Sequence, residues 1–319
     1  MKRVVTIQDI SCFGKCSITV ALPILSCMGL ETVLLPTAVL STHTMFPHPV
    51  IRDLSDLLEP IVAHWESLQL QFDGIYSGYL ASIRQVQITR EFLHEFSKDK
   101  EDHPVLRFVD PAMADHGRLY SGFNKDFVIA MSKLSSDADI IVPNLTEACL
   151  LTGTPYRETY DDAFIHMLLR KLGSLGTKQA VLITGVRLSD SDETKNIICH
   201  EDSLFREEQH KGMDKKHQTM GTGIAGYDIK GDRFFGVRHE LLPESFHGTG
   251  DIFASTLFGA LMRDLPLEKA IEIAAEFAVD TMKETMQHPV KRGYGVLFET
   301  ELPKLINRLD KACTASGSS

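Results

Sequence analysis

The sequence has 319 residues, of which 43% are hydrophobic and 24% charged, so it can bury the core of a globular, enzyme-sized protein. Its 33 basic and 43 acidic side chains leave a net charge of −10, which disfavours binding to nucleic acid or to an anionic membrane surface. A single nucleotide is still compatible with this charge, because oriented main-chain amides act locally and salt screens distant charge beyond about 10 Å.

The cysteines and the apolar stretches indicate the cellular setting. The six cysteines are Cys12, Cys16, Cys27, Cys149, Cys199 and Cys313. They lack the close, repeated spacing of a disulfide framework or a zinc site, so we expect free thiols in a reducing compartment. No apolar stretch approaches the roughly 18 residues that a bilayer-spanning helix needs. We therefore expect a cytoplasmic protein that is neither secreted nor embedded in a membrane.

Short β-branched, apolar runs alternate with helical stretches along the chain. We expect strands that begin at Val4, Thr32, Gly74, Val105, Asp139 and Ala180. Between them, segments 53–65 and 163–172 carry apolar side chains at helical spacing. Such alternation predicts βαβ units and a mainly parallel sheet with helices on both faces.

The later part of the chain is more polar. Residues 188–218 show no sustained apolar period, so we expect a long surface excursion there. Two further strands, 223–229 and 233–241, are joined by a hairpin-like turn at 230–232. Because no Pro/Gly/Ser-rich linker divides the sequence, we expect one domain over 1–313. Residues 314–319 are expected to be a disordered tail or a remnant of cloning.

The most informative segment is Gly248-Thr249-Gly250-Asp251, which leads into an apolar stretch at helical spacing. The two glycines remove side chains from the turn, so successive main-chain N–H groups can converge on one anion at a helix N-terminus. Asp251 follows this amide cradle, and its carboxylate can accept a proton from a substrate hydroxyl. Taken alone, the four residues are equally compatible with a simple turn that carries an aspartate near an N-cap.

Two further polar segments follow predicted strands. One is 110–115, which begins with Asp110, and the other is 143–153, which contains Asn144 and Glu147. In open α/β sheets ligands bind beyond the carboxyl ends of the strands, so these groups can position a water-coordinated Mg²⁺ ion against nucleotide phosphates. Taken singly, each side chain is more typical of a helix cap or a solvated group. Their combination with segment 248–251 favours a phosphoryl-transfer site.

These three segments resemble the DPVMGD-type, PNxxE and GTGD motifs of the vitamin kinases in the ribokinase-like superfamily. The resemblance implies a three-layer α/β/α fold with a mainly parallel central sheet and a site along its C-terminal edge. It also implies ATP, with its γ-phosphate over 248–250, and a bound Mg²⁺ ion. Water must be kept from such a site, so residues 115–123 are expected to be a moving flap or an ordinary surface loop.

The resemblance also implies roles for single residues. Asp110 and Glu147 would organise the metal, mostly through water. Asn144 and Glu147, with Thr184 and Gly185, would lie on the nucleotide side. Pyridoxal kinases often have Thr-Pro-Asn where this chain has Val-Pro-Asn at 142–144, so a need for K⁺ stays open.

Three segments of the N-terminal half are similar to pyridoxal and pyridoxamine kinases. TIQDIS at 6–11, LSTHT at 40–44 and SGY at 77–79 resemble their S-I-Q-S, F-S-N-H-T and T-G-Y segments, so the resemblance extends from there to about residue 310. It implies a homodimer that phosphorylates the 5′-hydroxymethyl group of a B6 vitamer. Thr44 and Tyr79 would line the pyridine pocket and His43 would support it. Asp9 stands where the family usually has serine.

Asp9 therefore has three interpretations. It faces the nitrogen of the substrate's pyridine ring and favours the protonated ring, or Ser11 makes the contact with the ring instead, or Asp9 is an ordinary strand-end aspartate. The sequence does not choose among them.

Other functions remain as alternatives. A hydroxymethylpyrimidine (phosphate) kinase of thiamine synthesis typically opens with A-G-S-D-x-S-G-G-A-G, whereas this chain has Gly14 alone. A sugar or nucleoside kinase typically has a Gly-Gly pair near the N-terminus. A non-catalytic nucleotide- or PLP-binding regulator is the alternative outside the enzymes, and Asp251 with its two adjacent glycines disfavours it.

Overall fold

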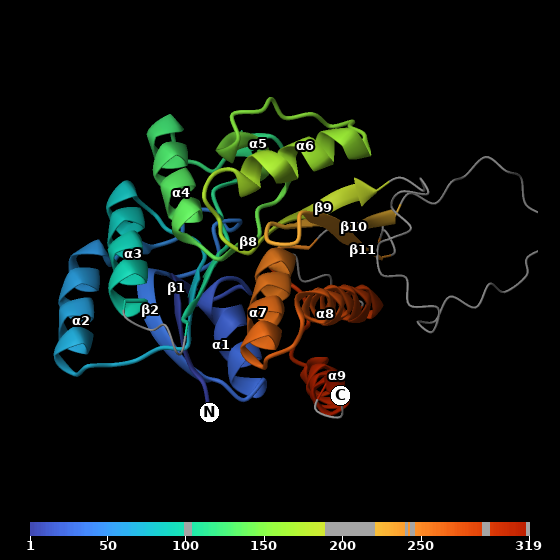
Figure 1. The fold of residues 1–319 in the computed structure, drawn as a ribbon. Helices are drawn as coiled ribbons and strands as arrows, with labels where there is room; N and C mark the ends of the chain where they lie inside the picture. Colours follow the sequence, from blue (N-terminus) through green and yellow to red (C-terminus); the bar gives the residue numbers. More distant parts are fainter. Residues whose placement is uncertain (99–103, 189–220, 240–241, 243–245, 289–293, 317–319) are drawn as a thin grey trace, which may run out of the picture.

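The computed structural model describes residues 1–98, 104–188, 221–239, 242, 246–288 and 294–316 (Figure 1). The strands of the main sheet are β1 (Arg3–Ser11), β2 (Glu31–Leu40), β3 (Ile51–Asp53), β4 (Gly74–Ser77), β5 (Leu106–Val109), β8 (Ile140–Ile141), β9 (Ala180–Leu188), β10 (Gly221–Asp228) and β11 (Arg233–His239). A separate small hairpin consists of β6 (Ala114–Asp115) and β7 (Arg118–Leu119). The helices are α1 (Ile18–Cys27), α2 (Ser55–Ser67), α3 (Ile83–Phe96), α4 (Lys125–Asp137), α5 (Leu145–Leu151), α6 (Asp162–Gly173), α7 (Thr249–Met262), α8 (Leu267–Gln287) and α9 (Leu302–Ser316).

The main sheet has nine strands in the order β11-β10-β9-β8-β5-β4-β1-β2-β3. The strands from β9 to β2 in this order pair in parallel. Antiparallel strands flank them at both edges, with β10 and β11 on one side and β3 on the other. The predicted mainly parallel sheet and the hairpin of the last two strands are therefore confirmed.

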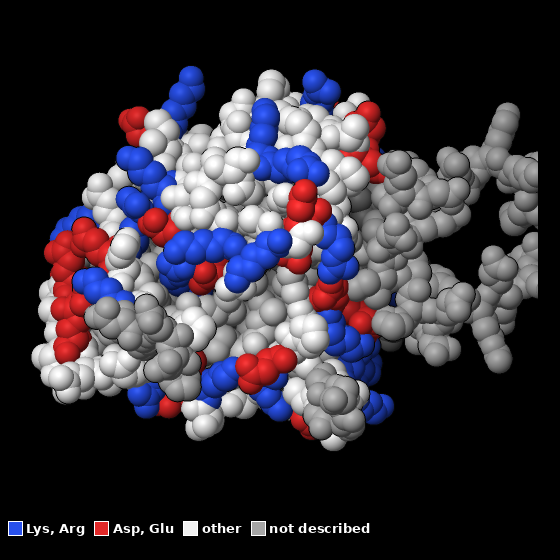
Figure 2. Space-filling model, in the orientation of Figure 1, with Lys and Arg blue, Asp and Glu red and all other residues white. Residues whose placement is uncertain are grey.

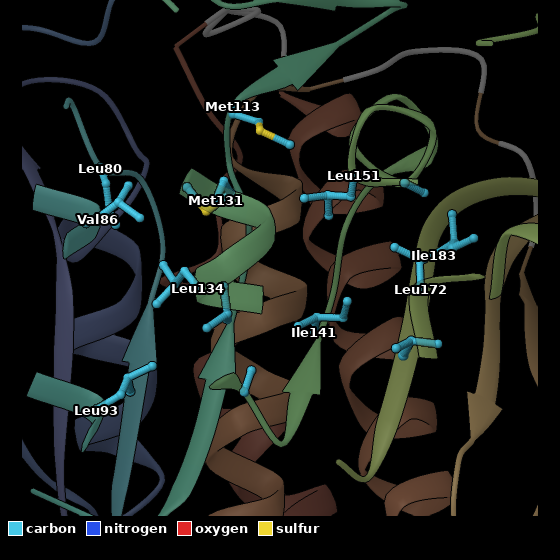
Figure 3. Close-up of a cluster of buried hydrophobic side chains, with 14 of the residues drawn as sticks. Leu80, Val86, Leu93, Met113, Met131, Leu134, Ile141, Leu151, Leu172 and Ile183 are labelled. Carbon is cyan, nitrogen blue, oxygen red and sulfur yellow. The ribbon is translucent and has the colours of Figure 1, made fainter. Parts of the chain in front are cut away.

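Helices cover both faces of this sheet, as the ribbon shows (Figure 1). Helices α2 to α6 pack on one face, where their side chains form one apolar core with residues such as Ile141 and Ile183 from the strands (Figure 3). Helices α1, α7, α8 and α9 pack on the other face around a second apolar core. The arrangement confirms the expected three-layer α/β/α fold.

Local chemistry explains where several elements begin and end. The side chains of Ser82, Asn124 and Asp161 accept hydrogen bonds from the first turns of α3, α4 and α6, as N-cap residues do. Strand β2 tolerates Pro36, because β3 pairs with β2 only from Ala38 onward and a missing N–H costs little on that side.

A buried ion pair fixes the relative position of two strands next to the site. The Arg107 guanidinium donates to both Asp139 carboxylate oxygens, at 3.0 and 2.6 Å, and the Arg107 N–H donates to the same carboxylate at 2.8 Å. Bidentate geometry makes such a pair specific. It holds β5 beside the start of β8, so the loops that follow these strands emerge together.

Elsewhere, Figure 2 shows basic and acidic side chains close to one another on one face of the molecule. Exposed ion pairs between described residues include Arg84 with Asp56 and Arg170 with Asp232. Such pairs add little stability each. Among the described helices, none combines the length and the hydropathy that a bilayer-spanning segment requires.

The structure moves the predicted start of the C-terminal tail, and it does not describe most of the predicted surface excursion. Residues 314–316, expected to belong to a tail, continue α9, which ends at Ser316 and packs Leu305, Leu309 and Ala312 into the second core. Of the predicted surface excursion 188–218, Leu188 is the last residue of β9 and the rest lies outside the described residues. Residues 317–319 lie outside them as well.

Candidate active site

A cavity of 630 Å³ lies at the carboxyl ends of the parallel strands. Asp110 follows β5, Asn144 and Glu147 follow β8, and Thr184 and Gly185 belong to β9; all five line the cavity. The main chain joins the last two segments, because the Thr184 N–H donates to the Pro143 carbonyl at 3.0 Å. The predicted nucleotide and metal residues are thus brought together at one sheet edge.

The start of α7 forms the facing wall, where residues 248–251 line the same cavity. Gly248 is the N-cap residue, with φ 81° and ψ 0°, a left-handed conformation that favours glycine. A Cβ atom on Gly248 would lie 2.2 Å from the Lys15 carbonyl oxygen, whereas one on Gly250 would meet no atom within 4 Å. The turn therefore needs glycine at 248 for its own geometry, and at 250 it leaves open space beside the helix N-terminus.

Asp251 lies in the first turn of α7 and faces the cavity. Its pKa is raised to about 6, chiefly by burial; hydrogen bonding by the Ser17 main-chain N–H opposes the rise, and the Asp9 charge adds a smaller contribution to it. A carboxyl group with a pKa near neutrality is suited to accept a proton during a reaction. The cavity thus places a proton acceptor beside a set of main-chain donors.

Glu147 clamps the two strand-end loops together. Its Oε1 atom accepts hydrogen bonds from the Met113 and Ala114 N–H groups at 2.9 and 3.3 Å. Its Oε2 atom accepts from the Asn144 N–H at 2.9 Å, and Asn144 Oδ1 accepts from the Glu147 N–H at 3.0 Å. The Asn144 side-chain amide also donates to the Ala114 carbonyl at 2.8 Å. Both side chains therefore shape the site in addition to lining it.

We expect Glu147→Ala to lower the free energy of unfolding by about 3 kcal/mol, because a capping box is lost and three buried N–H groups lose their acceptor. Glu147→Gln keeps one acceptor oxygen but turns an N–H donor toward another donor. Its free energy of unfolding should therefore fall by less than that of Glu147→Ala. Thermal or urea unfolding of both variants measures the difference. Equal losses would show that the carboxylate charge, and not its role as an acceptor, stabilises the loops.

Asp110 adds negative charge to the same cavity. Burial, and then the charges of Glu147 and Asp251, raise the pKa of its carboxyl group well above the usual range. Mutual repulsion of this kind would be relieved by a bound cation. Within the part of the chain that the structure describes, no three His, Cys, Asp or Glu side chains converge as direct metal ligands. The buried, mutually repelling carboxyl groups fit a Mg²⁺ ion, which takes oxygen ligands, and the ion itself stays a prediction.

The predicted substrate-binding residues lie in different surroundings. His43 lines the cavity, with its ring centroid 5.4 Å from that of His247, and burial followed by the His247 charge lowers its pKa. Thr44 is exposed, and the Tyr79 ring packs against Phe123 with centroids 5.8 Å apart. Neither Thr44 nor Tyr79 is among the described residues that line this cavity. A pyridine pocket formed by these side chains stays a prediction.

Asp9 and Ser11 are buried beneath the site. Asp9 is 4% exposed and Ser11 1% exposed, and the Ser11 hydroxyl donates to an Asp9 carboxylate oxygen at 3.3 Å. The Ser17 hydroxyl also faces this carboxylate and opposes the rise in its pKa that burial causes. All three interpretations of Asp9 stay predictions.

Several lining residues were not anticipated from the sequence. Cys16 lines the cavity, and burial, followed by the charges of Asp251 and Asp9, raises the pKa of its thiol. Ala275, Ala278 and Met282 of α8 form an apolar wall. Their spacing along the helix is a detectable signal, but small residues at such spacing are more often simply packed against another helix.

The predicted flap 115–123 overlaps the β6–β7 hairpin. The Gly117 N–H donates to the Thr146 hydroxyl at 2.9 Å, and the Tyr120 N–H donates to the Met113 carbonyl at 2.9 Å. The first bond ties the hairpin to α5, the second closes the base of the hairpin itself, and Tyr120 lines the cavity. Movement of this segment stays a prediction.

The chain is similar over most of its length to known kinases. A family model described as phosphomethylpyrimidine kinase matches residues 69–226. The pyridoxal kinase PdxY of Aliivibrio fischeri is 34% identical over 239 residues, which span 70% of this chain and 78% of that protein. A Bacteroides thetaiotaomicron structure assigned as a phosphomethylpyrimidine kinase, in a crystal form with pyridoxal, is 35% identical with a TM-score of 0.80 and covers 95% of both chains.

The pyridoxal kinase structure from Lactobacillus plantarum is 30% identical with a TM-score of 0.78, and the match covers 96% of this chain and 97% of that one. The chain therefore belongs to the family of pyridoxal and phosphomethylpyrimidine kinases and has their ribokinase-like fold.

Proposed function

We propose that this kinase transfers the γ-phosphoryl group of ATP to the 5′-hydroxymethyl group of pyridoxal or a related B6 vitamer. The observation that carries the proposal is the position of Asp251, which faces a 630 Å³ cavity directly beside the glycine-flanked start of α7. The resemblance of segments 6–11, 40–44 and 77–79 to pyridoxal kinases and the relatives named for pyridoxal support the choice of substrate.

In this proposal the chain supplies position and charge. The N–H groups of residues 248–250 and the N-terminus of α7 stabilise the oxygens of the transferred phosphoryl group. The substrate hydroxyl lies against Asp251, whose carboxylate takes the proton as the oxygen attacks. Holding both reactants in one cavity converts a bimolecular encounter into a local displacement.

Asp110 and Glu147 would hold a Mg²⁺ ion mostly through water, because their buried carboxyl groups repel one another and a cation would relieve that repulsion. Such an ion, when bound, neutralises phosphate charge. Glu147 itself keeps the loops 110–114 and 144–147 in register, so it contributes to the site even before a nucleotide binds.

A hydroxymethylpyrimidine (phosphate) kinase is the second candidate, because the matching family model carries that description. A competition assay distinguishes the two. Pyridoxal, pyridoxamine, pyridoxine and hydroxymethylpyrimidine are offered together with ATP and Mg²⁺, and the products are separated by mass. We expect the B6 phosphates to dominate. A clear preference for the pyrimidine would overturn the substrate assignment, and ATP hydrolysis without any phosphorylated acceptor would overturn the kinase proposal.

The pH dependence of turnover is expected to follow Asp251. The carboxyl group must be ionised to accept a proton, and its pKa is raised to about 6. Below this pKa the ionised fraction falls about tenfold per pH unit, so kcat/KM should rise with pH and level off above about pH 7. The substrates' own ionisations are measured separately and subtracted. A profile that is flat between about pH 5 and 8 would contradict the role of Asp251.

A further inference from the structure

Two histidines from distant parts of the chain meet in the cavity. His43 lies in the loop that follows β2, and His247 stands directly before Gly248, the N-cap residue of α7. Both line the cavity, and their rings lie side by side, with centroids 5.4 Å apart and planes inclined by 49°. Neither ring takes part in the transfer steps assigned to Asp251 and the amide cradle.

The main chain fixes His247 beside the amide cradle. Gly248 adopts φ 81°, and its carbonyl accepts the Ile252 N–H at 3.0 Å, which starts α7. The Thr249 hydroxyl donates to the Phe246 carbonyl at 3.2 Å and so closes the turn around His247. A ring at this place lies close to the partial positive charge of a helix N-terminus, where an anion is favoured.

His43 is held by the loop 12–17 and by its own turn. Its N–H donates to the Phe13 carbonyl at 2.8 Å, and a Cβ on Gly14 would lie 2.7 Å from the His43 Cβ, so the loop packs closely against this residue. The His43 Nδ1 atom accepts the Met45 N–H at 3.2 Å. The neutral ring therefore carries its hydrogen on Nε2, and this N–H is the donor that His43 can offer to a ligand.

Histidines are the described side chains of this cavity that can supply positive charge. Among the lining residues that the structure describes there is no lysine or arginine; the ionisable ones besides the pair are Asp110, Asp115, Glu147, Asp251 and a third histidine, His239. Cys16 and Tyr120 also line the cavity, and burial raises the pKa of both groups, so they stay uncharged near neutral pH. On the adjoining loop 12–17, the Lys15 ammonium group is paired with Glu299 at 2.5 Å.

The two rings repel each other when both are protonated. Burial, followed by the His247 charge, lowers the pKa of His43. A phosphate group in contact with both rings would reverse that effect, because its negative charge favours the protonated form of each. The pair is thus suited to an anion that forms in the cavity and later leaves it.

We propose that His43 and His247 together bind the phosphoryl group as it is transferred, each ring donating an N–H to a phosphate oxygen and one ring carrying a positive charge. In the transfer, the acceptor oxygen bonds to the γ-phosphorus, the bond to the β-phosphate oxygen breaks, and the hydroxyl proton goes to Asp251, while both histidines keep their protons. The inference rests on the proposed phosphoryl transfer. It adds to the amide cradle a side-chain contact that distinguishes the phosphorylated product from the acceptor alcohol.

His43→Gln and His247→Gln test the proposal, because glutamine keeps an N–H donor but cannot carry the charge. Each chain is titrated calorimetrically at about pH 6.5 with pyridoxine 5′-phosphate and with pyridoxine. We expect the Kd of the phosphate ester to rise about tenfold in each variant, as for a lost hydrogen bond between charged groups, and the Kd of pyridoxine to stay within about twofold. His64→Gln, on the exposed side of α2, is the matched control and should leave both values unchanged.

The loss of affinity in each variant should depend on pH. A histidine contributes its charge below its pKa, so the ratio of the Kd of the variant to that of the unaltered chain should fall between about pH 6 and 9. The ionisation of the phosphate ester cancels from this ratio, because the same ligand is used with both chains.

A second titration separates this inference from the choice of acceptor. Inorganic phosphate is added to a chain that contains isotope-labelled histidine, and the ring-nitrogen resonances of His43 and His247 are assigned from the two variants. We expect both to shift toward the protonated form, while that of His64 stays in place. This result does not depend on which alcohol the kinase phosphorylates, so it survives a wrong substrate assignment.

Four results would overturn the inference. Equal losses of affinity for pyridoxine and for its phosphate would identify the histidines as contacts of the acceptor ring. A loss in only one variant would show that the two rings do not act as a pair. Losses that do not vary with pH would exclude a charged contact. Unchanged phosphate-ester affinities, with resonances that inorganic phosphate does not move, would exclude any contact with the phosphoryl group.

Discussion

Asp251→Asn is expected to lower kcat by a factor of about 10² to 10⁴, the usual contribution of a general base. Asparagine has nearly the same shape as aspartate, so the start of α7 and its N–H groups should keep their positions. It has no basic oxygen of comparable strength, however, and cannot take the proton of the attacking hydroxyl. The measurement is steady-state phosphorylation of pyridoxal with ATP, with kcat and KM determined separately.

The nucleotide-binding side of the cavity provides the control for this prediction. Asp251→Asn should still bind ATP, because the N–H groups of 248–250 and the residues at the strand ends are unchanged. Calorimetric titration with ATP verifies this. A kcat within about threefold of the unaltered enzyme would remove Asp251 as the base and leave it a role in charge or in helix capping.

The sequence revealed those parts of the site whose function depends on residues that are neighbours along the chain. Gly248 and Gly250 stand before an apolar helix, and a helix N-terminus without side chains can be identified from neighbouring residues alone. Asp110 and Asn144 were found in a similar way, because each follows an apolar strand and parallel strands end at one edge. Strand lengths were less predictable: β8 spans only Ile140–Ile141, shortly before Pro143.

The parts that the sequence did not reveal depend on contacts between distant segments. Asp9 lies at the end of a strand in a segment resembling a substrate motif, yet it is 4% exposed. Nearby in the sequence, the loop 12–17 meets the start of α7, where a Cβ on Gly248 would lie 2.2 Å from the Lys15 carbonyl oxygen. Those two segments are more than two hundred residues apart in the sequence, so no local pattern reports their packing. The capping of α5 by Asn144 could be predicted, whereas the hydrogen bonds from Met113 and Ala114 to Glu147 could not.

Gly248→Ala and Gly250→Ala should separate the two requirements that the amide cradle places on its glycines. Alanine at 248 would have to adopt φ 81° and would place its Cβ 2.2 Å from the Lys15 carbonyl oxygen, a main-chain atom that cannot move freely. We expect the free energy of unfolding to fall by about 3 kcal/mol and the cradle to be displaced. Alanine at 250 meets no atom within 4 Å, so its unfolding midpoint should not fall.

Activity should fall in both variants, but for different reasons. In Gly248→Ala the N–H groups move away from the phosphoryl oxygens, which should lower kcat by about 10² or more. In Gly250→Ala the added methyl group stands in the open space at the wall of the cavity, so ATP binding should weaken while the fold persists. Unfolding midpoints, ATP affinity and kcat of the two variants measure this difference. An unfolding midpoint that is unchanged in Gly248→Ala would mean that the loop 12–17 does not press on α7 as described.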